Sequence, residues 1–89
     1  MSQNQETLIE FPCDFPLKVM GPNHPDFVSA ILLRVQQHDP QFTLEKISIR
    51  VSAKGTYQSL TLNVYATSRQ QLDAVYLAVT SHPDVKWTL

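Results

Sequence analysis

The fold is decided by one stretch of the sequence, YQSLTLNVYATSRQQLDAVYLAV, at residues 57–79. In its first part polar residues alternate with the apolar residues Leu60, Leu62, Val64 and Ala66. This alternation is typical of a strand with one buried face. In its second part the apolar residues follow helical spacing, at Leu72, Val75, Tyr76 and Val79. The stretch therefore predicts a strand over residues 57–66 that leads into an amphipathic helix.

The same pattern occurs earlier in the chain. Leu17 and Val19 alternate with polar neighbours and predict a short strand that stops at Gly21-Pro22. A helix is predicted over residues 25–38, with an apolar stripe at Val28, Ile31, Leu32 and Val35. Residues 44–52 predict a strand with Ile47, Ile49 and Val51 on its inner face, and Val85, Trp87 and Leu89 predict the inner face of a last strand. The predicted order is βαββαβ.

Local signals support these boundaries. Asn23 or His24 can cap the first helix, and Pro25 suits its first position because the missing N–H would have no partner there. Asp39-Pro40 predicts its end. Ser68 with Gln71 fits a capping box for the second helix, and Gly55 suits a hairpin turn that needs positive φ.

These elements predict an α+β fold of the ferredoxin-like βαββαβ type. The four-stranded antiparallel sheet would have strand order 4-1-3-2 and both helices on one face. The predicted core is Val28, Ile31, Val35, Leu60, Leu62, Val64, Leu72, Val75 and Val79.

The composition indicates one soluble domain. Residues 1–10 predict a mobile polar tail and residues 11–89 a single domain, with the proline-containing segment up to Phe15 lying irregularly over an edge of the core. Cys13 is the only cysteine, so an internal disulfide is excluded. No signal-like or membrane-spanning apolar run is present, and we expect a cytoplasmic protein without membrane contact.

From Phe11 onward the sequence resembles a known family. The resemblance is carried by FP at residues 11–12 with Phe15, KVMG at 18–21, SAKGTY at 52–57, TSRQQLDAVY at 67–76, and SHP at 81–83 with Val85-Lys86. On these residues the chain is similar to the YbeD-like family of small, functionally uncharacterised bacterial proteins. The resemblance implies a ferredoxin-like fold similar to amino-acid-sensing ACT domains and a regulatory role, and it carries no established activity or functional residues. Cys13 and Trp87 lie outside the pattern.

Catalysis is poorly supported by the sequence. The loop at residues 21–25 lacks the arginine with which the ferredoxin-like acylphosphatases hold phosphate. Cys13 with His24 could form a nucleophile and base, but a buried inert thiol explains Cys13 better. His38 and His82 fall near predicted helix ends, where capping explains them better than metal binding. We predict no enzyme activity and no cofactor or metal.

Charge distribution is the most informative functional signal. The predicted outer face of the sheet carries Lys18, Lys46, Arg50 and Lys86, with Lys54 at the hairpin tip. The simpler explanation is that these are solvated lysines, which are commonplace on an exposed sheet and deter edge pairing. The functional interpretation is a regulatory or interaction module, able to form a homo-oligomer, that binds a protein partner or a small anion there. The alternative is an RNA- or DNA-associated module that uses the same face. It would make phosphate contacts alone, because the positions that stack bases in an RRM are occupied by Thr56 and Gln58, neither of which is aromatic.

Overall fold

The computed structural model describes residues 10–88. Two α-helices, a short 3-10 helix and four strands follow one another along the chain. They are β1 (Cys13–Pro22), α2 (Pro25–Gln36), η1 (Leu44–Lys46), β2 (Ile47–Val51), β3 (Tyr57–Ala66), α3 (Arg69–Thr80) and β4 (Trp87–Thr88). The predicted tail lies almost entirely outside the described residues, as does Leu89.

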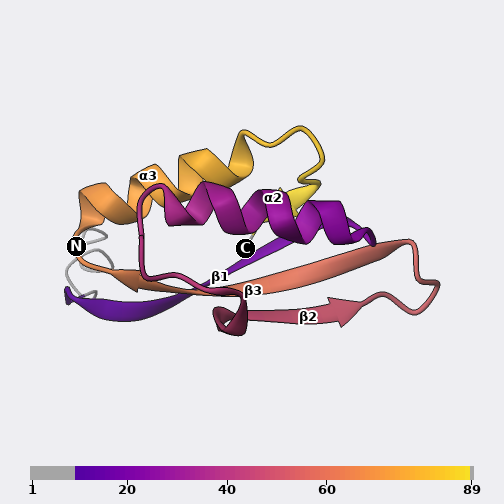
Figure 1. Cartoon of the computed structure of the whole chain (residues 1–89), viewed down its shortest axis with the longest axis horizontal. Coiled ribbons are helices and arrows are strands. Elements are labelled where there is room, and N and C mark those ends of the chain that lie inside the picture. The colour runs from indigo at the N-terminus through magenta and orange to yellow at the C-terminus, as the bar shows by residue number, and fades with distance from the viewer. Residues whose placement is uncertain (1–9, 89) are drawn as a thin grey trace, which may run out of the picture.

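The molecule has two layers. Figure 1 shows α2 and α3 side by side on one face of the sheet. All neighbouring strands are antiparallel, and the sheet order is β2-β3-β1-β4, in which β4 contributes a two-residue ladder. The predicted α+β class, with two helices against an antiparallel sheet, is confirmed.

Strand β1 is much longer than predicted, because it begins at Cys13 rather than near Leu17. The segment expected to be irregular up to Phe15 is therefore partly strand. Asn23 N–H donates to Thr56 O at 3.1 Å, and this fixes the odd-numbered residues of β1 as those bonded to β3. The backbone nitrogen of Pro16, which carries no hydrogen, therefore faces away from β3. On that side of β1, β4 pairs only with Val19 and Met20. Proline is tolerated there as it is on an edge strand.

Strand β2 is shorter than predicted and less buried. Leu44–Lys46 form the 3-10 helix η1, so Lys46 is not a strand residue. The predicted facing of β2 agrees with the register, since Ile47 pairs with Leu62 and Ile49 with Leu60. Only Ile47 is buried, however. Ile49 and Val51 share the face of Ile47 but stay about half exposed, because alternation reports facing and does not report whether a helix covers the strand.

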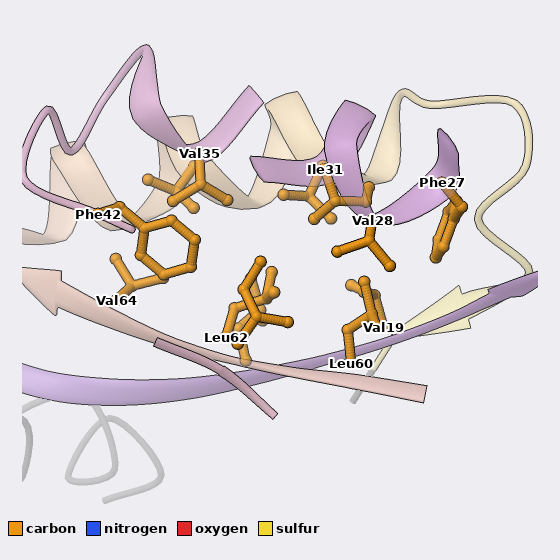
Figure 2. Packing of buried hydrophobic residues seen from close by; sticks show 13 residues of the cluster. Val19, Phe27, Val28, Ile31, Val35, Phe42, Leu60, Leu62 and Val64 are labelled. Carbon is orange, nitrogen blue, oxygen red and sulfur yellow. The ribbon is translucent and has the colours of Figure 1, made fainter. Parts of the chain in front are cut away.

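The core lies between the helices and β1 and β3. All nine predicted core residues are buried. Two phenylalanines were missed, Phe27 and Phe42, and Figure 2 shows them at opposite ends of the row formed by Val28, Ile31 and Val35. Phe42 is fully buried although it lies in the loop after α2, where Gln36 Nε2 donates to its carbonyl oxygen at 2.8 Å. Its burial depends on how this loop folds back over the sheet.

Strand β4 pairs with β1 at two positions. Position 87 lies opposite Met20, and position 88 lies opposite Val19, which is a core residue. The side chains at positions 87 and 89, which are predicted to continue the inner face, lie outside the described part of the structure. Val85 does pack against the core as predicted. Between Val85 and β4, Lys86 N–H donates to Met20 O at 2.7 Å.

The predicted caps and turn are present. His24 is the N-cap of α2, and Ser68 is the N-cap of α3, accepting from Gln71 N–H. The side-chain oxygen Oε1 of Gln71 accepts from Thr67 N–H at 3.2 Å, one residue earlier than in a capping box. Gly55 has φ of 76°. Helix α2 ends at Gln36 rather than at residue 38, and Asp39 accepts from Tyr65 N–H through Oδ2 at 3.2 Å.

Candidate functional site

The candidate site lies on the outer face of the sheet, the face away from the helices. Two rows of paired residues cross this face. The first runs from Lys18 through Thr61 to Ser48, and the second from Met20 through Ser59 to Arg50. Since residues directly opposite each other in antiparallel strands share a face, Lys18 and Arg50 lie on one surface, diagonally across β3.

These two rows enclose a shallow pocket of about 310 Å³, lined by Lys18, Ser48, Ile49, Arg50, Ser59 and Thr61. We call it the outer-face pocket. Three hydroxyls and two cationic groups are among the groups that line it, and one of the hydroxyls, Ser59 Oγ, also donates to Arg50 O at 3.5 Å. The pocket therefore offers hydrogen-bond donors and positive charge. Within residues 10–88 the side chains of Lys18 and Arg50 have no ion-pair partner. The structure therefore brings together two of the five basic residues predicted for this face.

The other three basic residues lie elsewhere. Lys46 is half-buried in η1, and Lys54 is exposed in the turn between β2 and β3. The register places position 88 level with Val19, so alternation does not put Lys86 on the face of Lys18. The predicted outer-face position of Lys86 is therefore not supported. None of the three lines the outer-face pocket.

A second cavity, of about 490 Å³, lies at the N-terminal end of α2 and contains two copies of one tripeptide. His-Pro-Asp occurs at residues 24–26 and again at 82–84, and both copies contribute their His and Asp to the lining. Asp26 N–H donates to His24 Nδ1 at 3.1 Å, and Asp84 N–H donates to His82 Nδ1 at 3.0 Å. The repeated tripeptide is visible in the sequence, but the sequence does not show that the two copies meet.

This hydrogen bonding fixes the chemistry of the two histidines. A neutral imidazole whose Nδ1 accepts a hydrogen bond carries its proton on Nε2. Such a ring offers no free lone pair to a metal ion. In the part of the chain that the structure describes, no group of three or more His, Cys, Asp or Glu side chains is arranged to hold a metal. His24 and His82 cap turns, and the His82 ring stands edge-on to Phe27 with centroids 5.7 Å apart.

The pairing of Cys13 with His24 is not formed. Cys13 begins β1 and His24 follows its other end, so the ten residues of the strand separate them. At about 3.3 Å a residue this is about 30 Å. Cys13 is half-buried at this far end, opposite Ala66. The two residues therefore do not form a nucleophile–base pair.

The architecture is that of a small α+β domain in which one sheet face supports two helices and the other is open. The chain belongs to the DUF493 family, because the protein-family model described as "Protein of unknown function (DUF493)" matches residues 6–89. A UPF0250 protein of Paraburkholderia phytofirmans is 48% identical over 89 residues, which is all of both chains. One from a Janthinobacterium species is 54% identical over 84 residues, covering 94% of this chain and 92% of its own. A Neisseria gonorrhoeae relative is 47% identical over 87 residues, covering 98% and 96%.

The resemblance to the YbeD-like family is thus confirmed over nearly the whole chain. The relatives are UPF0250 proteins of bacteria. Among residues 10–88, neither helix is long and apolar enough to cross a membrane.

Proposed function

We propose that the protein is a non-enzymatic interaction module that binds an anionic group, a carboxylate or a phosphate, in the outer-face pocket. The observation that carries this proposal is the position of Lys18 and Arg50 around the hydroxyls of Ser48, Ser59 and Thr61. Charged donors make hydrogen bonds about twice as strong as neutral ones. A carboxylate or phosphate oxygen can accept from both the cations and the hydroxyls.

The shape of the site favours a small anion or an acidic segment of a protein over a nucleic acid. Along β3 the outer face has tyrosines only at its two ends, Tyr57 and Tyr65, eight residues apart. At about 3.3 Å a residue they lie about 26 Å from each other, too far to stack neighbouring bases. The pocket itself contains no aromatic ring.

A regulatory role in the cytoplasm is part of this proposal. The element order and the two helices on one face support a ferredoxin-like assignment, and the similarity to ACT-type regulatory domains depends on that assignment. An open sheet face suits recognition, because the strands position the backbone from which its side chains project.

The test is a titration of the isotopically labelled protein with inorganic phosphate and with a Glu-rich peptide, followed by backbone amide NMR. Shifts are expected at Lys18, Ser48, Arg50, Ser59 and Thr61. The double variant Lys18→Ala/Arg50→Ala should bind at least tenfold more weakly, about 1.4 kcal/mol. Its melting curve should be close to that of the parent, because exposed charges contribute little to folding.

The matched control is Lys54→Ala/Lys86→Ala, which removes the same charge outside the pocket and should leave binding nearly unchanged. Arg34 is unsuitable as a control, since its Nη1 donates to Ala78 O at 2.8 Å and to Ser81 Oγ at 2.9 Å and so joins α2 to the end of α3. Equal losses in both double variants would contradict the proposal. Tighter binding to a single-stranded oligonucleotide, with a steep salt dependence, would replace it with the nucleic-acid alternative.

A further inference from the structure

The strand β2 is an uncovered edge of the sheet. It pairs with β3 on one side only, and Figure 1 shows it at the border of the sheet. Three apolar side chains there are about half exposed, Leu44 at 56%, Ile49 at 50% and Val51 at 48%. Leu44, Ile49 and Val28 also line a groove of about 390 Å³ between this edge and α2. An exposed apolar edge is normally protected by charge, proline or a covering segment, and on β2 itself the only charged residue is Arg50.

The backbone of β2 is also open to pairing. Ser52 N–H donates to Tyr57 O at 2.9 Å, and since bonded pairs alternate, Ser48 and Arg50 are the residues of β2 whose backbone faces β3. The N–H and C=O groups of Ile49 and Val51 and the C=O of Ile47 therefore point outward. The Ile47 N–H is already used, because it donates to Leu44 O.

We propose that a second copy of this chain pairs with this edge, β2 against β2, in an antiparallel manner with Ile49 opposite Ile49. A twofold axis at Ile49 puts Ile47 opposite Val51 of the second copy. The two copies would then share about four backbone hydrogen bonds, two at Ile49 and one at each Ile47–Val51 pair. Both helical layers lie on the same side, and the half-exposed Ile49 and Val51 become cross-strand neighbours on the core face.

Charge complementarity selects this register over its neighbours. With the axis at Ile49, Arg50 lies opposite Ser48 of the second copy, and no like charges face each other. Moving the axis to Arg50 brings the two copies of that residue together, and moving it to Ser48 brings Arg50 next to η1 of the second copy, which carries Lys46. Like charges directly opposite are destabilising. Beyond the end of β2, Glu45 approaches the hairpin of the second copy, which carries Lys54.

The pairing also extends the outer-face pocket, a consequence that rests on the function proposed above. The row from Lys18 through Thr61 to Ser48 continues across the axis into Arg50 of the second copy. An anion beside Ser48 would therefore meet cations from both copies. The dissociation constant of the dimer should then be lower in phosphate buffer than in chloride buffer. This comparison is separate from the test of dimerisation itself, which uses chloride buffer alone.

Sedimentation of the full chain at several concentrations in chloride buffer tests the pairing itself. The parent should show a reversible monomer–dimer equilibrium. Ile49→Lys places two like charges at the axis and should raise the dissociation constant at least tenfold while the circular dichroism stays native. Leu77→Lys makes the same kind of change at another exposed apolar residue, on α3, and should leave the dimer intact. A parent that is monomeric at all concentrations, or equal effects of the two variants, would overturn the proposal.

Cross-linking tests the register. In a Cys13→Ser background, Ile49→Cys places two thiols directly opposite each other, at a Cα separation of about 5.5 Å that a disulfide can span. Oxidation should give a covalent dimer. Val51→Cys is the control, because its two copies would be about 13 Å apart along the strands. Equal cross-linking of both variants would overturn the register even if the protein dimerises, and neither result depends on anion binding.

Discussion

The substitution Gly21→Ala should destabilise the protein, because the ring of Phe27 lies directly on Gly21. A Cβ at position 21 would stand 2.3 Å from Cζ of that ring and 2.6 Å from Cε1 and Cε2. Carbon atoms in contact are normally about 3.5–4.0 Å apart, so the ring would have to retreat by more than 1 Å. Phe27 is 3% exposed, and the space next to it is the cavity that it lines with His24 and His82.

The expected loss in the free energy of unfolding follows from the surface of Phe27 that this movement exposes. A phenylalanine buries about 150–250 Å². If half of the ring enters the cavity, about 100 Å² returns to water, which costs about 2.5 kcal/mol at about 25 cal/mol per Å². The backbone entropy that alanine saves relative to glycine offsets about 0.5–1 kcal/mol of this. We therefore expect Gly21→Ala to lower the free energy of unfolding by about 2 kcal/mol.

Urea denaturation followed by circular dichroism measures this loss. The double variant Gly21→Ala/Phe27→Leu removes the ring atoms that clash, so its loss should be smaller than the sum of the two single losses by at least 1 kcal/mol, a coupling typical of residues in contact. A Gly21→Ala curve that overlays the parent, or strictly additive losses, would refute the reasoning.

Three other expectations concern stability. Phe42→Ala should cost about 3–5 kcal/mol in urea denaturation, since this side chain is fully buried although it lies in a loop; a loss below 1 kcal/mol would show that the loop is not part of the core. Gly55→Val should cost about 1 kcal/mol or more, because φ is 76° there and open space surrounds the position, so backbone strain alone acts; the measurement is the melting temperature, and an unchanged value would contradict it. His24→Ala should cost about 0.5–2 kcal/mol through loss of the N-cap of α2, and nitrogen NMR of the parent should find the proton of neutral His24 on Nε2. A proton on Nδ1 would contradict the cap.

The periodicity of the sequence predicted which helices and strands are present better than it predicted the residues at which they begin and end. Strand β3 has the bounds that its alternation predicts, and Gly55 and Ser68 act as their local chemistry requires. Phe42 was not predicted because it belongs to no periodic stripe. Phe27 lies four residues before Ile31, in phase with the stripe of α2, but the predicted stripe begins only at Val28. Phe27 is buried by its contact with Gly21, and Phe42 by a loop.

The candidate site was predictable only in part, since facing depends on register. Lys18 and Arg50 lie in strands whose register with β3 follows the alternation, and the structure brings them to one pocket. Lys46 and Lys86 lie just outside strands, where alternation carries no information about direction. The sequence does not predict that the two His-Pro-Asp tripeptides line one cavity, because this depends on how two loops, 58 residues apart, approach in space.

The carboxylate of Asp39 has a consequence for how many copies can associate. Strand β3 extends four residues beyond the last one that β2 pairs, and there Asp39, only 6% exposed, occupies the N–H of Tyr65. At the opposite border of the described residues, β4 has two residues and the open side of β1 contains Pro16, which has no N–H to donate. Within residues 10–88, β2 is therefore the edge that can accept an added strand over its whole length. A pair of copies joined there uses up the available edge, so association ends at a closed dimer and does not continue into a filament.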